Sequence, residues 1–266
     1  ASGIGRALAE RFADAKMRVV LADVEEAPLR GAEEALLERG AEAIAVRTDV
    51  RTLESIEELQ RRAVEAFGKV HVLCNNAGVG TGGLLWQQSD ADWQWVLGVN
   101  LWGVINGVRA FLPAMIAHGE EAHIVNTASV AGLVAGPFQG AYNVSKFGVV
   151  ALSETLYYEL QVVQAKVGVS VLCPGFVSTR IADASRNRPE EFGAPGVAPD
   201  PDNPIGQMVR KMIADGMPPS DVAQQVFEAI SAGRLYVLTH HDFDAAIRDR
   251  MEAIVDRRNP ALQGLA

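Results

Sequence analysis

The chain has 266 residues, of which 48% are hydrophobic and 21% charged, so it can build one large α/β domain or two small ones around a sizeable core. A formal net charge of −9 without basic runs argues against nucleic acid or an anionic membrane surface as the main partner. Cys74 and Cys173 lie in apolar stretches, which indicates buried thiols in a reducing, cytoplasmic compartment, with no disulfide framework and no metal site.

Apolar runs of strand length alternate with segments of helical periodicity along the chain. The glycine turn at 3–5 leads into a first helix that ends near residue 15. Strands are expected at 18–23, 41–46, 69–74, 122–129, 167–173 and 234–239, and helices at 28–39, 53–67, 90–117, 141–164, 219–232 and 242–257. Strands without polar alternation are buried on both faces, so the pattern predicts a Rossmann-like, doubly wound parallel sheet with helices on both faces, in a single domain over residues 1–266.

Residues 178–218 interrupt this alternation with a segment rich in Pro, Gly, Asp and Asn. A long irregular segment inside a compact domain is typical of a lid or binding loop, and a disordered insertion is the alternative. We expect it to form a substrate-binding loop.

The glycines at 3–5 have the character of a phosphate-binding turn. Glycine lets the backbone approach a pyrophosphate, and a helix start offers N–H groups with a positive dipole end. Asp23 ends the next strand, 20 residues after Gly3, where a carboxylate accepts from the ribose hydroxyls of NAD and repels a 2′-phosphate. NADP stays open as an alternative, because Arg6 or Arg47 can approach the adenosine.

Two further polar stretches follow strands. Asp49 and Val50 come after the strand at 41–46, where a polar residue contacts an adenine edge or simply caps a helix. Residues 75–78, with the sequence NNAG, follow the strand at 69–74, where small residues permit close contact with a ligand or form a turn.

Ser129 and the pair Tyr142 and Lys146 form the strongest constellation. Residues four apart share one helix face, so the Lys146 ammonium lies near the phenol and favours its ionised form. Ser129 ends the preceding strand, so the two hydroxyls are expected to hold one carbonyl oxygen while the phenol gives or takes a proton.

Taken in order, these motifs resemble the short-chain dehydrogenase/reductase family over roughly residues 1–180. The matching stretches are GIG at 3–5, Asp23, Asp49-Val50, NNAG at 75–78, Asn100, Ser129, Tyr142 with Lys146, and Pro174-Gly175 with Thr179. The resemblance implies that Tyr142 is the general acid/base, that Lys146 lowers its pKa and binds the nicotinamide ribose, and that Ser129 orients the substrate oxygen. It also places Asn100 in a proton relay to Lys146.

The resemblance also implies a cofactor site. Its residues are Ser2, Gly3, Ile4, Gly5, Asp23, Asp49, Val50, Asn76, Ala77, Gly78, Tyr142, Lys146, Pro174, Gly175, Val177 and Thr179. The family pattern begins with a strand and a Thr-Gly pair that the printed sequence does not contain. We therefore expect about 10–20 further residues before Ala1, carrying the central strand and the first glycine of the loop.

The expected substrate is a hydrophobic secondary alcohol or ketone. Its site would be lined by Ser129, Tyr142, Phe138, Gln139 and Trp86, together with the loop at 178–218. Packing or a subunit contact is the preferred interpretation of the remaining tryptophans, Trp93, Trp95 and Trp102.

The family packs its two long helices between subunits, which predicts a homodimer or homotetramer. The leading hypothesis is an NAD-dependent alcohol dehydrogenase or ketone reductase. The alternatives are an NADP-dependent carbonyl reductase of the same family and a nucleotide-sensing protein without catalysis. A sugar-nucleotide epimerase is disfavoured, because its loop has a different glycine spacing.

Overall fold

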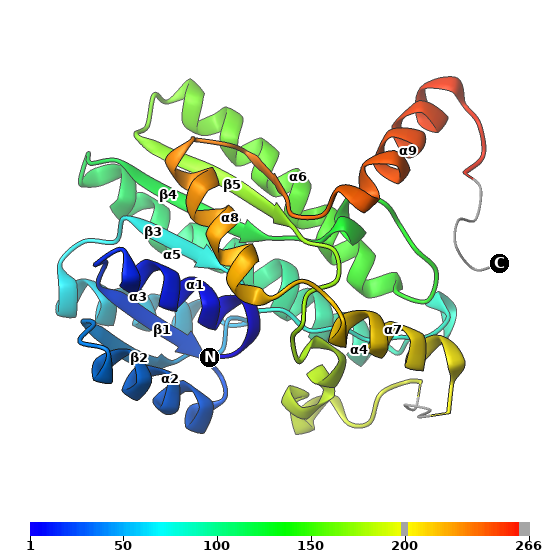
Figure 1. The fold of residues 1–266 in the computed structure, drawn as a ribbon, viewed down its shortest axis with the longest axis horizontal. Helices are drawn as coiled ribbons and strands as arrows, with labels where there is room; N and C mark the ends of the chain where they lie inside the picture. Colours follow the sequence, from blue (N-terminus) through cyan, green and yellow to red (C-terminus); the bar gives the residue numbers. More distant parts are fainter. Residues whose placement is uncertain (198–201, 261–266) are drawn as a thin grey trace.

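The computed structural model describes residues 1–197 and 202–260, which form parallel strands between two layers of helices (Figure 1). Strands β1 (Val19–Asp23) and β2 (Ala43–Arg47) pair with each other. Strands β3 (Val72–Asn75), β4 (Ala122–Thr127), β5 (Val167–Cys173) and β6 (Tyr236–Leu238) form a second parallel sheet in that order. This architecture confirms the predicted α/β fold class.

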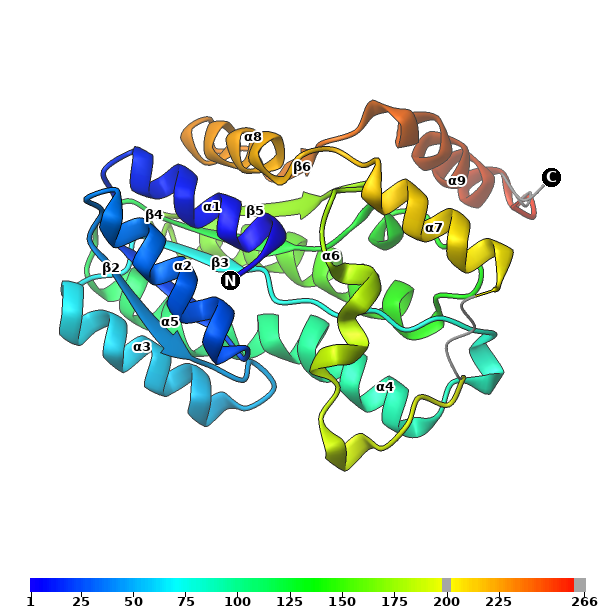
Figure 2. The ribbon, with the colours of Figure 1, turned by 60° about the horizontal axis from the view of Figure 1, so that its bottom comes forward.

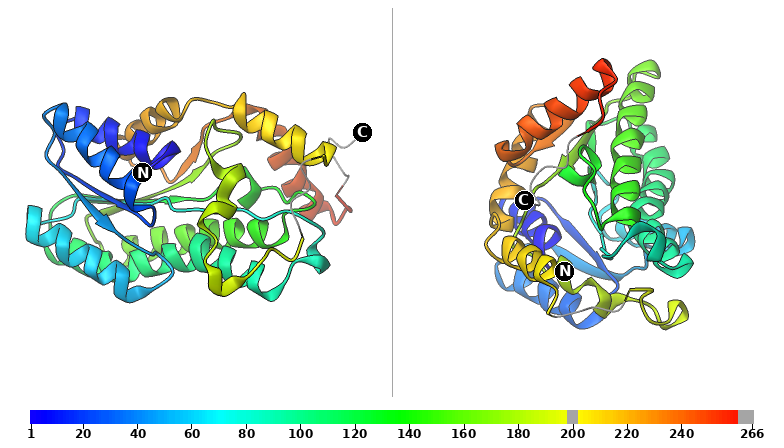
Figure 3. Two further views of the ribbon diagram at one scale, coloured as in Figure 1. Left: turned by 90° about the horizontal axis from the view of Figure 1, so that it is seen from below. Right: turned by 90° about the vertical axis from the view of Figure 1, so that its right-hand side faces the viewer.

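The helices cover both faces of the strands (Figures 2 and 3). Helices α1 (Gly3–Asp14), α2 (Glu26–Glu38) and α8 (Pro219–Ser231) lie on one side. Helices α3 (Leu53–Phe67), α5 (Gly103–Ala117) and α6 (Gly140–Val162) lie on the other. Helix α9 (Asp244–Asp256) follows β6 and projects from the body (Figure 1).

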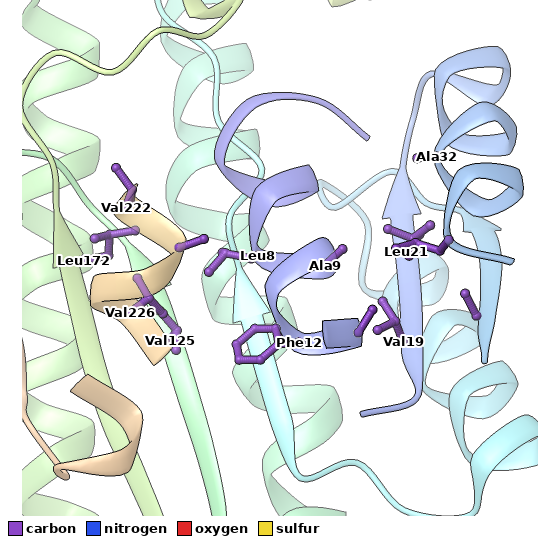
Figure 4. Close-up of a cluster of buried hydrophobic side chains, with 14 of the residues drawn as sticks. Leu8, Ala9, Phe12, Val19, Leu21, Ala32, Val125, Leu172, Val222 and Val226 are labelled. Carbon is purple, nitrogen blue, oxygen red and sulfur yellow. The ribbon is translucent and has the colours of Figure 1, made fainter. Parts of the chain in front are cut away.

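Strands β1 and β3 have no pairing with each other among the described residues. Helix α1 packs across this junction, where Leu8 and Phe12 join one core cluster with Leu21 of β1 and Val125 of β4 (Figure 4). The expectation that every strand is buried on both faces is wrong here, because Ala22 is exposed and all of β3 is only half-buried.

The long helix predicted at 90–117 is confirmed, but its middle is not α-helical. It consists of α4 (Asp90–Leu97), a π-helical turn over Gly98–Trp102, and α5. By length and composition this 28-residue segment would also pass for a membrane span. It has the surroundings of an internal helix, because buried Asn100 and Asn106 make hydrogen bonds inside the protein and α5 packs against α3.

The segment 178–218 is more regular than predicted. It contains 3₁₀ turns over Ile181–Asn187 and Glu190–Phe192 and an α-helix, α7 (Pro204–Ala214). Helix α7 starts where Asn203 accepts hydrogen bonds from the backbone of Ile205 and Gly206, with proline at the first helical position. Residues 198–201 of the predicted loop lie outside the described residues.

Candidate active site

The start of α1 meets the loops that follow β3 and β5. Gly3 has φ +51°, and a β-carbon there would lie 2.9 Å from the methyl group of Thr179. A β-carbon on Gly5 would lie 2.8 Å from the amide nitrogen of Asn76. The positive φ makes glycine the favoured residue at position 3, and the two contacts bring three of the predicted cofactor segments together.

The N-terminus of α1 fits an anionic group. Ser2 has an extended backbone and its side chain does not cap the helix, and the first turn contains no acidic residue. The first-turn N–H groups therefore have no side-chain acceptor from Ser2, and with the helix dipole they favour a pyrophosphate. The residues present fit a dinucleotide.

Asp23 lies at the carboxyl end of β1, beside this loop. Its carboxylate accepts hydrogen bonds from the nitrogen of Ala1 (2.6 Å) and the backbone N–H of Glu25 (2.9 Å). The structure thus places Asp23 beside Ala1, two residues before the first glycine of the turn.

Asp49 differs from the simple expectation of an adenine contact. Burial by itself raises the pKa of Asp49, but hydrogen bonds from Arg51, as short as 2.6 Å, outweigh it and lower that pKa. Val50 lies against Gly103, where a β-carbon would be 2.8 Å away, and its carbonyl accepts from Asn106. This turn is therefore already engaged within the protein.

Asn100 lies in the π-helical turn and is fully buried. Its Oδ1 accepts from the N–H of Val79 (2.8 Å), and its Nδ2 donates to the Val79 carbonyl (2.9 Å) and to Ser145 Oγ (3.1 Å). A β-carbon on Gly78 would lie 3.6 Å from both Asn100 Oδ1 and Lys146 Nζ. The turn at 75–78 therefore lies beside both polar side chains.

Lys146 and Tyr142 lie together on α6, with the ammonium nitrogen 5.5 Å from the centre of the phenol ring. Lys146 donates to the carbonyl of Thr127 (2.9 Å), and burial lowers its pKa to about 8. Burial raises the pKa of Tyr142 above its ordinary value, although a hydrogen bond from Ser129 acts in the opposite direction. Burial therefore favours the protonated phenol.

Ser129 connects this pair to the loop after β5. It caps the 3₁₀ turn Val130–Gly132 by accepting from the N–H of Ala131 (3.1 Å). Its hydroxyl also lies 3.4 Å from the carbonyl of Pro174. All four predicted catalytic residues are thus gathered at one edge of the sheet.

The expected substrate-binding residues fall into two groups. Phe138 and Gln139 lie directly before α6. The carbonyl of Phe138, a residue with φ 64°, accepts a hydrogen bond from the N–H of Gly83, and Gln139 forms an isolated β-bridge with the same glycine. Trp86 is 76% exposed, and the structure does not bring its side chain into the cluster around Tyr142. Trp95 is 2% exposed, as a packing residue should be.

Three ion pairs that the sequence does not indicate join the segment 181–196 to the rest of the domain. Arg186 pairs with Glu25 (2.6 Å), Glu191 pairs with Arg51 (2.7 Å), and Arg188 pairs with Asp92 (2.8 Å). The partners are 96 to 161 residues apart in the sequence, so no local spacing signals them. Two of them join this segment to the loops that carry Asp23 and Asp49, and the third joins it to α4.

A parallel sheet with a glycine turn at a helix start and, at its carboxyl edge, a tyrosine beside a buried lysine defines the class of dinucleotide-dependent oxidoreductases. The family model described as short chain dehydrogenase matches residues 1–190, and the chain belongs to this family.

Curated relatives share about a third of its residues. A CLA biosynthesis dehydrogenase/reductase from Lactiplantibacillus plantarum is 34% identical, over 96% of this chain and 90% of that protein. A 1-deoxy-11-beta-hydroxypentalenate dehydrogenase from Streptomyces exfoliatus is 33% identical, over 96% and 85%. A 3beta-hydroxysteroid dehydrogenase 2 from Eggerthella lenta is 35% identical, over 73% and 74%.

Solved structures of dehydrogenases share the fold of this chain. A short chain dehydrogenase/reductase from Burkholderia phymatum in complex with NAD has a TM-score of 0.96 and 48% identity, covering 100% of this chain and 94% of that one. An alcohol dehydrogenase from Thermococcus sibiricus complexed with 5-hydroxy-NADP has a TM-score of 0.72 and 25% identity, covering 89% and 91%. The protein is an oxidoreductase enzyme of this family with a nicotinamide cofactor.

Proposed function

We propose that the protein is an NAD-dependent oxidoreductase that interconverts hydrophobic secondary alcohols and ketones. The observation that carries this proposal is the cluster of Asn100, Ser129, Tyr142 and Lys146, gathered beside a glycine turn that fits a pyrophosphate. The nicotinamide, when bound, supplies the hydride acceptor or donor.

In this proposal Tyr142 exchanges the proton of the substrate oxygen, and Ser129 holds that oxygen. Burial favours the protonated phenol of Tyr142, which is the form that donates a proton to a ketone oxygen. Alcohol oxidation needs the phenolate, which the Lys146 ammonium favours. Asn100 would support the proton relay to Lys146, because its carboxamide and the ammonium both lie at Gly78.

Tyr142→Phe tests the catalytic assignment. It removes the hydroxyl and keeps the ring, so turnover should fall by about 10³-fold or more while NADH binding and unfolding temperature stay near wild type. Tyr158→Phe is the matched control, because Tyr158 lies on the same helix about four turns further on, outside the cluster around Tyr142, and the change keeps its ring. Full turnover by Tyr142→Phe would refute the assignment, and NADH binding by the wild type without turnover on any substrate would favour a nucleotide-sensing protein.

The preference for NAD is supported by Asp23 at the end of β1, where its carboxylate would repel a 2′-phosphate. NADP is the alternative, since relatives in complex with that nucleotide share the fold. The ratio of kcat/KM for NAD and NADP decides between them. Asp23→Ser should move that ratio toward NADP, and a wild type that prefers NADP overturns the proposal.

The proposal of a hydrophobic substrate draws on the exposed apolar side chains of α7, which are Ile205, Met208 and Met212. One of the relatives is by name a hydroxysteroid dehydrogenase. A panel of cyclic secondary alcohols, including steroid-sized ones, against charged sugar alcohols tests this point. Faster turnover of the sugar alcohols would contradict it.

We also propose that the protein is a cytoplasmic homodimer or homotetramer. A second subunit would then cover exposed apolar and aromatic side chains of α6 and of the π-helical turn between α4 and α5. These are Val144, Tyr158 and Val162 on α6 and Trp102 in the turn. Light scattering after size exclusion measures the mass in solution, and a monomer at micromolar concentration would refute the assembly.

A further inference from the structure

The loop that follows β5 is held from its outer side by one imidazole ring. Nδ1 of His240, at the end of the β6 segment, lies 3.1 Å from the backbone nitrogen of Gly175. Nε2 of the same ring lies 3.0 Å from the carbonyl oxygen of Phe176. The ring thus joins two consecutive residues of a loop that the chain reaches 65 residues earlier.

Only one form of the ring satisfies both contacts. The Gly175 nitrogen can only donate, so Nδ1 must be the unprotonated acceptor, and the Phe176 oxygen can only accept, so Nε2 must carry the hydrogen. The hydroxyl of Thr239 lies 2.7 Å from Nδ1. The two backbone contacts therefore assign the ring hydrogen to Nε2 and leave Nδ1 as the acceptor.

The packing around the ring leaves this loop little freedom. A β-carbon on Gly175 would lie 2.9 Å from Cγ of His240 and 2.6 Å from the ring of Phe243. Phe243 also contacts Phe176, with ring centres 6.4 Å apart. The peptide of Gly175 is thus fixed by hydrogen bonds and by the absence of space.

The loop connects two parts of the site. At one end, the carbonyl of Pro174 accepts from the N–H of Val130 (3.0 Å) and lies 3.4 Å from the Ser129 hydroxyl. At the other end, Thr179 contacts the glycine turn at Gly3. A shift of the loop would therefore move the support of Ser129 and one wall of the cofactor cradle together.

We propose that His240 is a positioning residue. It fixes the loop at 174–179 relative to Ser129, and through this loop it shapes the part of the site that receives the nicotinamide. This inference rests on the proposed function. The ring of His240 contacts this loop, Thr239 and Phe243, so His240 acts through the loop and not on substrate.

A graded set of substitutions separates the two contacts. His240→Asn keeps an acceptor near Nδ1, His240→Gln keeps a donor near Nε2, and His240→Phe keeps only the ring. His241→Phe is the matched control, because the neighbouring histidine is 93% exposed at its side chain and pairs with Asp244.

Binding is measured by titration with NADH and with ADP-ribose, which lacks the nicotinamide. We expect His240→Phe to weaken NADH at least about tenfold and ADP-ribose by a clearly smaller factor, because only the far end of the loop, at Thr179, meets the glycine turn; the Asn and Gln variants should lie in between. The kcat should fall more than KM for the alcohol rises, and His241→Phe should match the wild type in every measurement. Equal losses for both ligands, or no loss for either, would overturn the inference.

A second measurement uses the wild type and therefore does not depend on whether a variant folds. Nitrogen-15 NMR of the wild type near pH 8 should show His240 with a hydrogen on Nε2 and none on Nδ1, and the opposite tautomer overturns the proposal. A wild type that binds no NADH would instead refute the proposed function, so the two failures are distinguishable.

Discussion

The buried ammonium of Lys146 lowers the free energy of unfolding, because this side chain is only 3% exposed and loses its contact with water. Burial lowers its pKa from 10.5 to about 8. Below pH 8 the folded and unfolded states both hold the proton, so the full cost of burying the charge is present. Between about pH 8 and 10.5 the folded state releases the proton first, and stability rises with pH from this group.

Lys146→Met should therefore stabilise the protein at neutral pH. The expected gain at pH 7 is up to about 3 kcal/mol in the free energy of unfolding, shrinking as pH approaches 10.5, while activity is lost. Denaturant unfolding at pH 7 and pH 9.5 checks this. Lys166→Met, at an exposed position before β5, should show no such dependence. A gain that is constant with pH would contradict the explanation.

Gly132 packs directly against the backbone of α6 at Lys146, on the helix that carries Tyr142 and Lys146. A β-carbon there would lie 2.5 Å from the carbonyl oxygen of Lys146 and 2.8 Å from its carbon, which are backbone atoms that cannot rotate away. Gly132→Ala should cost about 1–3 kcal/mol of stability and reduce turnover, because α6 must shift. Gly136→Ala, with open space around it, should be near neutral in thermal unfolding and in activity. Similar effects at both sites would refute this reason.

At the scale of elements, Asp92 holds the segment 181–196 to α4. It caps α4 with Ser89 and accepts from Arg188 and from the N–H of Gly196. Burial by itself raises the pKa of Asp92, but the hydrogen bonds from Ser89 and Gly196 and the charge of Arg188 outweigh it and lower that pKa. Its contribution to stability is therefore present at neutral pH and is lost as pH falls through the lowered pKa.

Asp92→Asn should release this segment. Arg188, 5% exposed at its side chain, would lose its charge partner, and breaking such a buried pair costs about 3–5 kcal/mol. Limited proteolysis should then cut within 181–197 faster than in wild type. Asp183→Asn breaks the Arg210 pair, whose side chains are both 56% exposed, and should leave the cleavage rate almost unchanged. Equal rates for both variants would contradict the prediction.

The sequence predicts elements well where periodicity is long and poorly where short caps decide. The helix at 90–117 and the strand at 167–173 repeat an apolar pattern over many residues, and both are confirmed. Helix α7 was predicted as loop, because the surrounding prolines and glycines outweighed the cap at Asn203. The ion pairs of the segment 181–196 leave no local pattern, since each partner lies far away in the chain.

At the scale of the whole molecule, the parallel arrangement of the strands makes the location of the site predictable from the sequence. Their carboxyl ends share one edge, so residues that follow successive strands, such as Asn76 and Ser129, had to meet there. The role of Asn100 came only from the family resemblance, since nothing in a helical segment indicates a π-helical turn. The ring of His240 and the burial of Tyr142 depend on packing between distant elements, which no spacing records.

Within residues 1–197 and 202–260, the facing edges of β1 and β3 have no strand paired to them. The N–H of Val19 donates to Glu42 toward β2, and in a parallel ladder the next residue points the other way. By the same alternation, Val20 and Ala22 face β3, and Val72 and Cys74 face β1. A further parallel strand between β1 and β3 would have both of these edges available for pairing.

Hydrogen exchange tests whether such a strand fits. In the 266-residue chain, the amides of Val20, Ala22, Val72 and Cys74 should exchange readily, because no ladder partner holds them. In a chain extended by an apolar strand and a Thr-Gly turn, the same amides should exchange about a hundredfold more slowly, and the free energy of unfolding should rise. The amide of Val171, which donates to Leu235 within the second sheet, is the internal reference. Exchange that is equally slow in both chains would show that β1 and β3 need no strand between them.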